Sequence, residues 1–161
     1  MNNDAEYIKS KFLEELNNQG IKQDDSSDLQ KLFLKEGGIN WPNPNSEIFL
    51  TKYGFLYVHV STSLKGFWGL RKGILDLLDR LSNPPLIILL KSRIEDDVRR
   101  GTKFVADGYI ISELGKPPMK RYPNLDSTEN DYKINEPNDL DNKAIILSIQ
   151  EIVQQIKQLP S

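Results

Sequence analysis

Residues 47–61 have the sequence EIFLTKYGFLYVHVS, in which two apolar runs are separated by Tyr53-Gly54. Isoleucine, phenylalanine, tyrosine and valine dominate both runs, and these residue types favour β-strands. Glycine in the short connection suits a tight turn. We therefore predict a β-hairpin with strands at 47–52 and 55–61.

Successive side chains in the second predicted strand point to opposite faces of the sheet. One face, which we expect to be the core face, carries Leu56, Val58 and Val60. The other carries Phe55, Tyr57, His59 and Ser61.

The residues before the hairpin predict two helices and a connector. Apolar residues recur at helical spacing from Ala5 to Leu16, after a cap at Asn3 or Asp4 and before Gly20. A shorter helix is expected after Ser27, with an apolar side of Leu29, Leu32 and Phe33 and an end at Gly37-Gly38. Residues 39–46 are rich in asparagine and proline, which predicts a connector.

Beyond the hairpin, the spacing of Leu70, Ile74, Leu77 and Leu81 predicts a helix over 70–81, which Pro84-Pro85 follows. Five aliphatic residues at 86–90 are typical of a central strand covered on both faces. The mixed charges of 91–103 indicate a solvated loop, and 104–111 predicts a further strand or a small hairpin turning at Asp107-Gly108.

The last third of the chain predicts a long irregular loop at about 115–140 and a helix at about 141–159. The helix has a narrow apolar seam of Ile145, Ile149, Ile152, Ile156 and Leu159. Such a seam packs on the parent sheet or pairs with a second subunit. The second alternative predicts a homodimer through the four isoleucines.

The order of these elements predicts one α/β domain over 1–161, with a mixed central sheet flanked by helices. The absence of cysteine excludes disulfides and thiol nucleophiles and suits the cytoplasm. No apolar run approaches the ~20 residues that a membrane span needs. The net charge of −2 gives no global attraction for nucleic acid, so such binding must be local.

One local candidate combines aromatic and basic residues, as a surface that stacks single-stranded bases does. It consists of Lys65, Trp68, Arg71 and Lys72. The alternative for Trp68 is a place beneath the sheet, because large aromatic side chains commonly dock helices.

Three segments together resemble the PD-(D/E)XK, or restriction-endonuclease-like, superfamily over about residues 1–112. They are SEIFL at 46–50, LYVHVSTS at 56–63 and KGFWG at 65–69, the last ahead of a helix, a Pro-Pro pair and an aliphatic strand. The resemblance implies a restriction-endonuclease-like core. It also implies two acids that hold a divalent metal, usually magnesium, and a lysine that helps the attacking water at a phosphodiester.

The chain departs from that pattern at its key pair. His59 stands at the position of the superfamily's acid and Ser61 at that of its lysine, while Glu47 lies near the position of the first acid. A variant metal site would combine Glu47 and His59 with Glu14 or Glu15, and imidazole suits zinc or manganese better than magnesium. The structural alternatives are a solvent-facing Glu47, an exposed helix side for Glu14 and Glu15, and a His59 that is hydrogen-bonded beside Tyr57 and Ser61.

Three functions remain open from the sequence. The first is a nuclease-fold domain that has lost ordinary metal-dependent cleavage and retains nucleic-acid or protein binding, without a cofactor. The second is an active variant endonuclease that uses Glu47 and His59 with magnesium or manganese. The third is a small adaptor or regulatory protein that acts through its C-terminal helix. A single histidine excludes His-based triads, and neither G-x-x-x-x-G-K-[ST] nor G-x-G-x-x-G occurs.

Overall fold

The computed structural model describes residues 4–32, 34–35, 45–61, 67–71, 86–97, 101–111, 131–135 and 147–159. The helices are α1 (Asp4–Asn18), α2 (Ser27–Leu32) and α4 (Ile149–Lys157). The strands are β1 (Ser46–Thr51), β2 (Gly54–Ser61), β3 (Phe67–Arg71), β4 (Leu86–Asp97), β5 (Gly101–Ile111), β6 (Asp131–Asn135) and β7 (Leu147–Ser148).

The main sheet has five strands in the order β1-β2-β4-β5-β7. Strands β2 and β4 are parallel, and the other neighbouring pairs are antiparallel. Strands β3 and β6 form a separate antiparallel pair. The predicted mixed α/β architecture is therefore confirmed, as are the hairpin of β1 and β2 and the central position of the strand that begins at Leu86.

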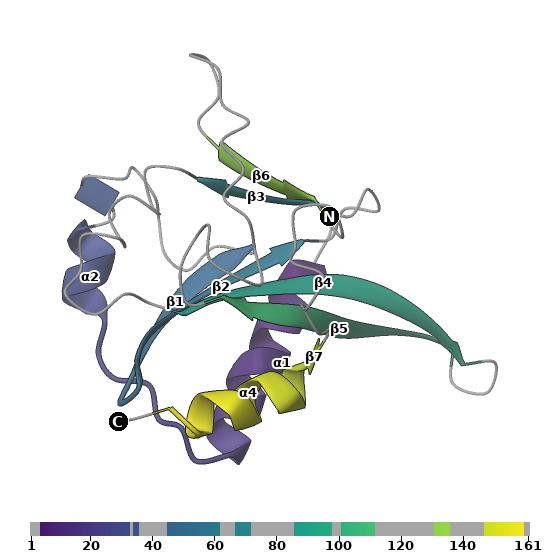
Figure 1. Cartoon of the computed structure of the whole chain (residues 1–161), viewed down its shortest axis with the longest axis horizontal. Helices are drawn as coiled ribbons and strands as arrows, with labels where there is room; N and C mark the ends of the chain where they lie inside the picture. The colour runs from purple at the N-terminus through teal and green to yellow at the C-terminus, as the bar shows by residue number, and fades with distance from the viewer. Residues whose placement is uncertain are drawn as a thin grey trace.

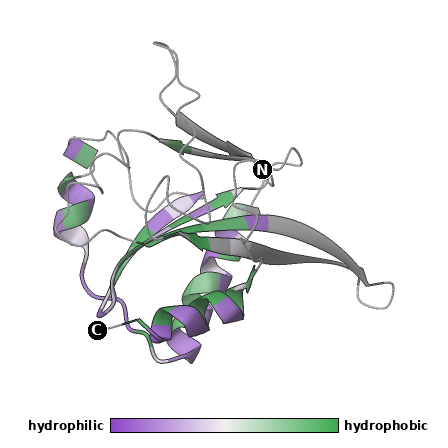
Figure 2. Ribbon diagram, viewed as in Figure 1, coloured by the Kyte–Doolittle hydropathy of each residue, from purple (hydrophilic) through white to green (hydrophobic). Residues whose placement is uncertain are grey.

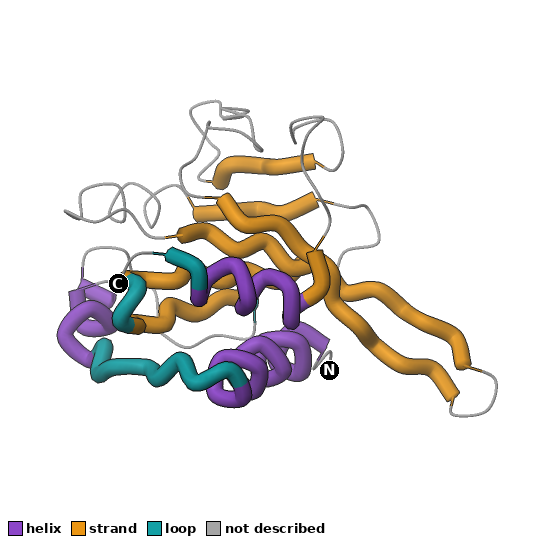
Figure 3. Tube along the Cα trace, turned by 60° about the horizontal axis from the view of Figure 1, so that its bottom comes forward, coloured by secondary structure: helices purple, strands orange, loops and turns teal. Residues whose placement is uncertain are grey.

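Helices α1 and α4 lie on one face of the main sheet, and the β3–β6 pair lies on the other side (Figure 1). The same two helices cover the sheet when the molecule is turned (Figure 3). The residues that the sheet buries against them are Phe49, Leu56, Val58, Val60, Ile88 and Leu90. Figure 2 shows the corresponding hydrophobic stretches on the strands and on both helices. The predicted core face of β2 is thus confirmed.

Helix α1 follows its predicted apolar periodicity. Ala5, Ile8, Phe12 and Leu16 are all buried. The helix ends in a Schellman motif, in which Ile21 N–H donates to the Leu16 carbonyl at 2.8 Å and Gly20 N–H to the Asn17 carbonyl at 3.1 Å. Gly20 has a φ of 80°, a left-handed conformation that glycine adopts without a steric penalty.

The opposite face of the sheet is also buried. Ile48, Tyr57, Ile87 and Leu89 point away from the two helices and are at most 5% exposed. Leu70 of β3, a strand that contacts β2, is fully buried as well. This confirms the prediction that residues 86–90 form a strand covered on both faces.

Several predicted elements are wrong in extent or type. Leu70 lies in a strand, so the predicted helix does not begin there, and 72–81 fall outside the described residues. The predicted solvated loop at 91–103 is largely strand, because β4 continues to Asp97 and β5 begins at Gly101. These two strands extend beyond the rest of the sheet (Figures 1 and 3). Strand β5 runs without a turn through Asp107-Gly108.

The C-terminal third also differs from the prediction. Strand β6 lies within the expected loop at 115–140, the rest of which is outside the described residues. Helix α4 begins only at Ile149, and its predicted part before residue 147 is not described. A capping box explains this start: Glu151 N–H donates to Ser148 Oγ at 3.2 Å, and Ser148 N–H donates to Glu151 Oε1 at 3.1 Å.

The predicted second helix is present but short. Gln30 Nε2 donates to Ser26 Oγ at 3.0 Å, just before the start of the helix. None of the residues of α2 is buried, and Leu32 is 38% exposed. The end expected at Gly37-Gly38 and the connector up to residue 44 lie outside the described residues.

Candidate functional site

The register of the β1–β2 hairpin decides which candidate residues share a face. The turn at Lys52-Tyr53 pairs Thr51 with Gly54, and the ladder then pairs Ser46 with His59. Directly paired residues on neighbouring strands point to the same face, and alternate residues point to opposite faces. His59 therefore shares its face with Ser46.

Glu47 lies on the other face of the sheet, the one that α1 covers. It pairs with Val58, which belongs to the core beneath the helices. Its Oε2 atom forms an ion pair of 3.4 Å with Nζ of Lys9 from α1, and the side chains are 24% and 11% exposed, respectively. Glu47 is thus a partner of the helix rather than a solvent-facing residue at a strand start.

His59 lies beside Tyr57 with their rings stacked at an interplanar angle of 7° and a centroid distance of 6.5 Å. The residue as a whole is half-buried, but its Nδ1 atom is buried and makes no hydrogen bond. Burial lowers the pKa of His59 to about 4, because desolvation disfavours the charged imidazole. The imidazole is therefore neutral near pH 7. The predicted place of His59 beside Tyr57 is confirmed, but Nδ1 does not take part in the hydrogen bonding that was predicted for this histidine.

Ser61 ends β2 next to a lysine of the neighbouring strand. The parallel register places Ser61 beside Lys91 of β4, so both side chains lie on the face of His59. Ser61 is 6% exposed and Lys91 is half-buried. The sequence alone did not place Lys91 beside Ser61, because that neighbourhood depends on the offset between two strands that are not consecutive in the chain.

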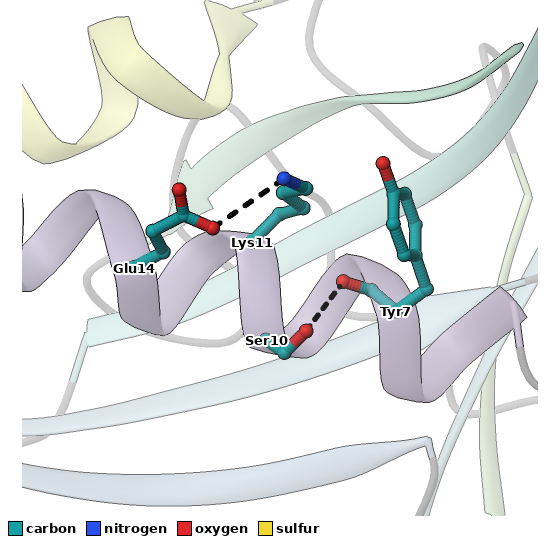
Figure 4. Close-up of polar contacts among 4 residues, drawn as sticks. All are labelled: Tyr7, Ser10, Lys11 and Glu14. Carbon is teal, nitrogen blue, oxygen red and sulfur yellow. Dashed lines mark hydrogen bonds and ion pairs between the residues drawn. The ribbon is translucent and has the colours of Figure 1, made fainter.

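The two candidate glutamates of α1 interact with side chains close to them in the sequence. Lys11 Nζ donates to Glu14 Oε2 at 3.4 Å and lies over the ring of Tyr7, on an exposed side of the helix where Ser10 also bonds the Tyr7 carbonyl (Figure 4). Glu15 accepts a hydrogen bond of 2.7 Å from Gln19. The exposed-helix interpretation is confirmed for Glu14, whereas Glu15 is partly buried.

The structure does not bring the residues of the variant metal site together. Glu47 and α1 lie on one side of the sheet, and His59 and Ser61 lie on the other. Among the described residues, no group of three or more histidine, aspartate or glutamate side chains could hold a metal ion. An imidazole with serine hydroxyls also differs from the oxygen-rich set that magnesium prefers. The residues that the structure describes therefore do not fit the magnesium site that the resemblance implies.

The predicted aromatic and basic patch is only partly visible. Trp68 and Arg71 lie in β3, where they pair with Ile134 and Asp131 of β6, and their side chains are not described. Lys65 and Lys72 fall outside the described residues. Nucleic-acid binding by this patch stays a prediction.

The apolar seam of the last helix packs within the chain. Ile152 and Ile156 are fully buried in the core with α1, and Ile149 packs against that core. The first alternative for the seam is therefore confirmed for these residues. Ile145 is outside the described residues, and the homodimer stays a prediction.

Comparison with protein-family models, with curated proteins and with solved structures found no match for this chain. No helix within the described ranges has the length and apolar character needed to cross a membrane.

Proposed function

We propose that this protein is a restriction-endonuclease-like domain that has lost ordinary metal-dependent phosphodiester cleavage and retains nucleic-acid or protein binding. Its element order supports the proposal: a helix precedes an antiparallel hairpin, and the second hairpin strand pairs in parallel with a later central strand. This arrangement fits the sequence segments that resemble the superfamily.

The proposed loss of cleavage rests on one observation, which is the side of the sheet on which each polar residue lies. Metal-dependent hydrolysis needs clustered carboxylates that hold the cation against the phosphate. The carboxylate of the hairpin, Glu47, is paired with Lys9 under the helices, while His59 and Ser61 lie on the opposite face. A neutral imidazole and a hydroxyl supply neither a negative charge to hold a cation nor a positive charge beside the water that would attack the phosphodiester.

A nicking assay tests this proposal. Full-length protein is incubated with supercoiled plasmid and magnesium or manganese, and open-circular and linear products are measured. We expect no products above those of a metal-free control. Metal-dependent nicking that disappears in both Glu47→Ala and His59→Ala would instead establish the variant endonuclease.

The binding half of the proposal has its own assay. Fluorescence anisotropy with labelled duplex and single-stranded DNA measures nucleic-acid binding, at several salt concentrations because phosphate contacts weaken as salt rises. Saturable, salt-sensitive binding without cleavage supports a nucleic-acid role. Absence of binding to both DNA forms would leave protein binding as the retained role.

A further inference from the structure

Strands β4 and β5 continue past the rest of the main sheet as a two-stranded arm (Figures 1 and 3). Their antiparallel register is unbroken as far as Asp97, which lies opposite Gly101. Strand β2 accompanies β4 only up to Lys91, because β2 ends at Ser61. From there on, β4 has β5 on one side and no strand of the described chain on the other. We call residues 92–97, on this open side of β4, the arm edge.

The arm edge is a place where a further strand can extend the sheet. An open strand edge presents a row of backbone N–H and C=O groups, and these groups pair readily with a strand from another chain. Helices α1 and α4 cover the sheet at the base of the arm and do not extend along it (Figure 3). Neither helix therefore covers the arm edge.

The sequence of the arm edge, SRIEDD, is complementary to itself. Two copies related by a twofold axis pair antiparallel, and each residue then lies opposite a residue on the same face of the sheet, so the axis falls at a residue. With Ile94 on the axis, Arg93 of each copy lies opposite Glu95 of the other. Ser92 then lies opposite Asp96. Opposite charges at directly opposed positions stabilise an antiparallel pair.

Every other symmetric register centred on the arm edge brings like charges together. An axis at Arg93 sets two arginines opposite each other, and an axis at residue 95, 96 or 97 sets two carboxylates opposite each other. An axis at Ser92 sets Arg93 opposite Lys91 of the other copy. Like charges at opposed positions are destabilising. The formal charges of the arm edge therefore select the register centred on Ile94.

The outer edge of β5 has no comparable pattern. Residues 102–106 of this strand have the sequence TKFVA, in which Lys103 is the single charged residue. A lysine on an edge strand is a common protection against pairing with another chain. Closer to the base of the arm, the same edge pairs with β7 at Asp107. Charge complementarity therefore favours the β4 side of the arm.

We infer that two copies of this chain associate through their arm edges, in the antiparallel register centred on Ile94. Backbone hydrogen bonds supply the affinity, and the charges of Arg93 and Glu95 fix the register and the choice of partner. A strand pair of this length is smaller than a standard interface of about 1,600 Å², so the dimer is reversible and depends on concentration. The inference is independent of the proposed function, because it requires neither cleavage nor nucleic-acid binding.

Charge exchange tests this interface in the full-length protein. Sedimentation velocity at about 5 to about 500 µM should show a monomer–dimer equilibrium. Arg93→Glu makes the arm edge wholly acidic and Glu95→Arg makes it basic at both positions, so each variant opposes like charges twice. Each should weaken association at least about tenfold. An equimolar mixture of the two variants should dimerise again, because an acidic arm edge then meets a basic one.

Two further variants separate the interface from a general charge effect. The double variant Arg93→Glu/Glu95→Arg exchanges the two charges within one chain and should dimerise like the natural chain. Lys52→Glu makes the same change of charge as Arg93→Glu in the exposed turn between β1 and β2, and it should leave association unchanged. Thermal unfolding followed by circular dichroism verifies that each variant is folded.

Three results would overturn the inference. The first is a natural chain that stays monomeric over the whole concentration range. The second is a dimer that persists in both single variants, which would place the contact on another surface, such as the C-terminal helix. The third is a mixture of the two single variants that stays monomeric.

Discussion

Acidification should destabilise the protein through its single histidine. The pKa of His59 is about 4 in the folded chain, against an ordinary value of 6.5. Between these values the unfolded chain binds a proton that the folded chain does not. The free energy of unfolding therefore decreases as the pH falls from about 6.5 towards 4, and the contribution of His59 is constant below that range.

The size of this effect follows from the shift. Each pKa unit corresponds to about 1.4 kcal/mol, so the complete loss is at most about 3 kcal/mol. Between about pH 7.5 and about pH 5, the linkage relation gives a loss of about 2 kcal/mol. Hydrogen bonds from Ser27 and Ser148 lower the pKa values of Asp25 and Glu151, and these carboxyl groups contribute only at more acidic pH.

Comparison with His59→Phe isolates the contribution of the imidazole. Phenylalanine keeps a ring beside Tyr57 and removes both the titration and the buried polar atom, so the variant should be at least as stable as the natural chain at about pH 7.5. Urea unfolding followed by circular dichroism at about pH 7.5 and about pH 5 gives the loss of stability on acidification for each protein. Equal losses in the two proteins, or an NMR titration of His59 with a midpoint near 6.5, would refute the reasoning.

Three further substitutions test the packing that positions the site. Gly108→Ala should destabilise the fold by about 2 kcal/mol or more in urea unfolding, because its Cβ would overlap the carbonyl oxygen of Leu89. Lys9→Met should cost about 1–3 kcal/mol, because it leaves the half-buried Glu47 carboxylate without its partner. Ser148→Ala should cost about 1 kcal/mol in thermal or urea unfolding, because the N-terminus of α4 loses its capping box.

Each of these substitutions has a control. Gly69→Ala adds a Cβ that meets nothing within 4 Å and should change stability little. The double variant Lys9→Met/Glu47→Gln removes both charges and should recover part of the loss. Ser10→Ala alters an exposed serine within α1 and should be neutral. A Gly108→Ala variant as stable as Gly69→Ala, or additive losses at Lys9 and Glu47, would contradict the described packing.

The sequence correctly predicts the elements whose apolar residues form a recognisable helix or strand pattern. Helix α1, the hairpin and the strand from Leu86 all show such a pattern, and all three are present. The outer part of the β4–β5 hairpin lacks such a pattern because it extends beyond the helices that cover the sheet (Figure 3). Mixed charges there resemble those of a loop.

The predicted helix wrongly included Leu70 and Arg71, because the strand partner of β3 lies far along the chain. Leu70 has helical spacing with later leucines, but β3 pairs with β6, about sixty residues away. Pairing with a distant strand overrides local periodicity, and a single sequence does not reveal it. The same holds for β6, in a segment that contains little to bury.

The sequence could have predicted that Glu47 and His59 lie on opposite faces of the sheet. A two-residue turn at Lys52-Tyr53 pairs Thr51 with Gly54 and therefore Glu47 with Val58. Alternation within β2 alone does not show this, because the face of a residue on β1 depends on the length of the turn. The position of Lys91 differs: it depends on the parallel offset between β2 and β4, which only the structure provides.

The contact between α1 and α4 also has a consequence for synthesis of the protein. Phe12 near the start of the chain and Ile152 and Ile156 near residue 159 belong to one core, and Gln19 bonds the Gln150 carbonyl across the two helices. A chain growing on the ribosome therefore exposes the apolar residues that α4 covers until α4 has emerged from the exit tunnel. Because incomplete cores of this kind attract other chains, chaperone binding during translation should end only after residues 147–159 have been released.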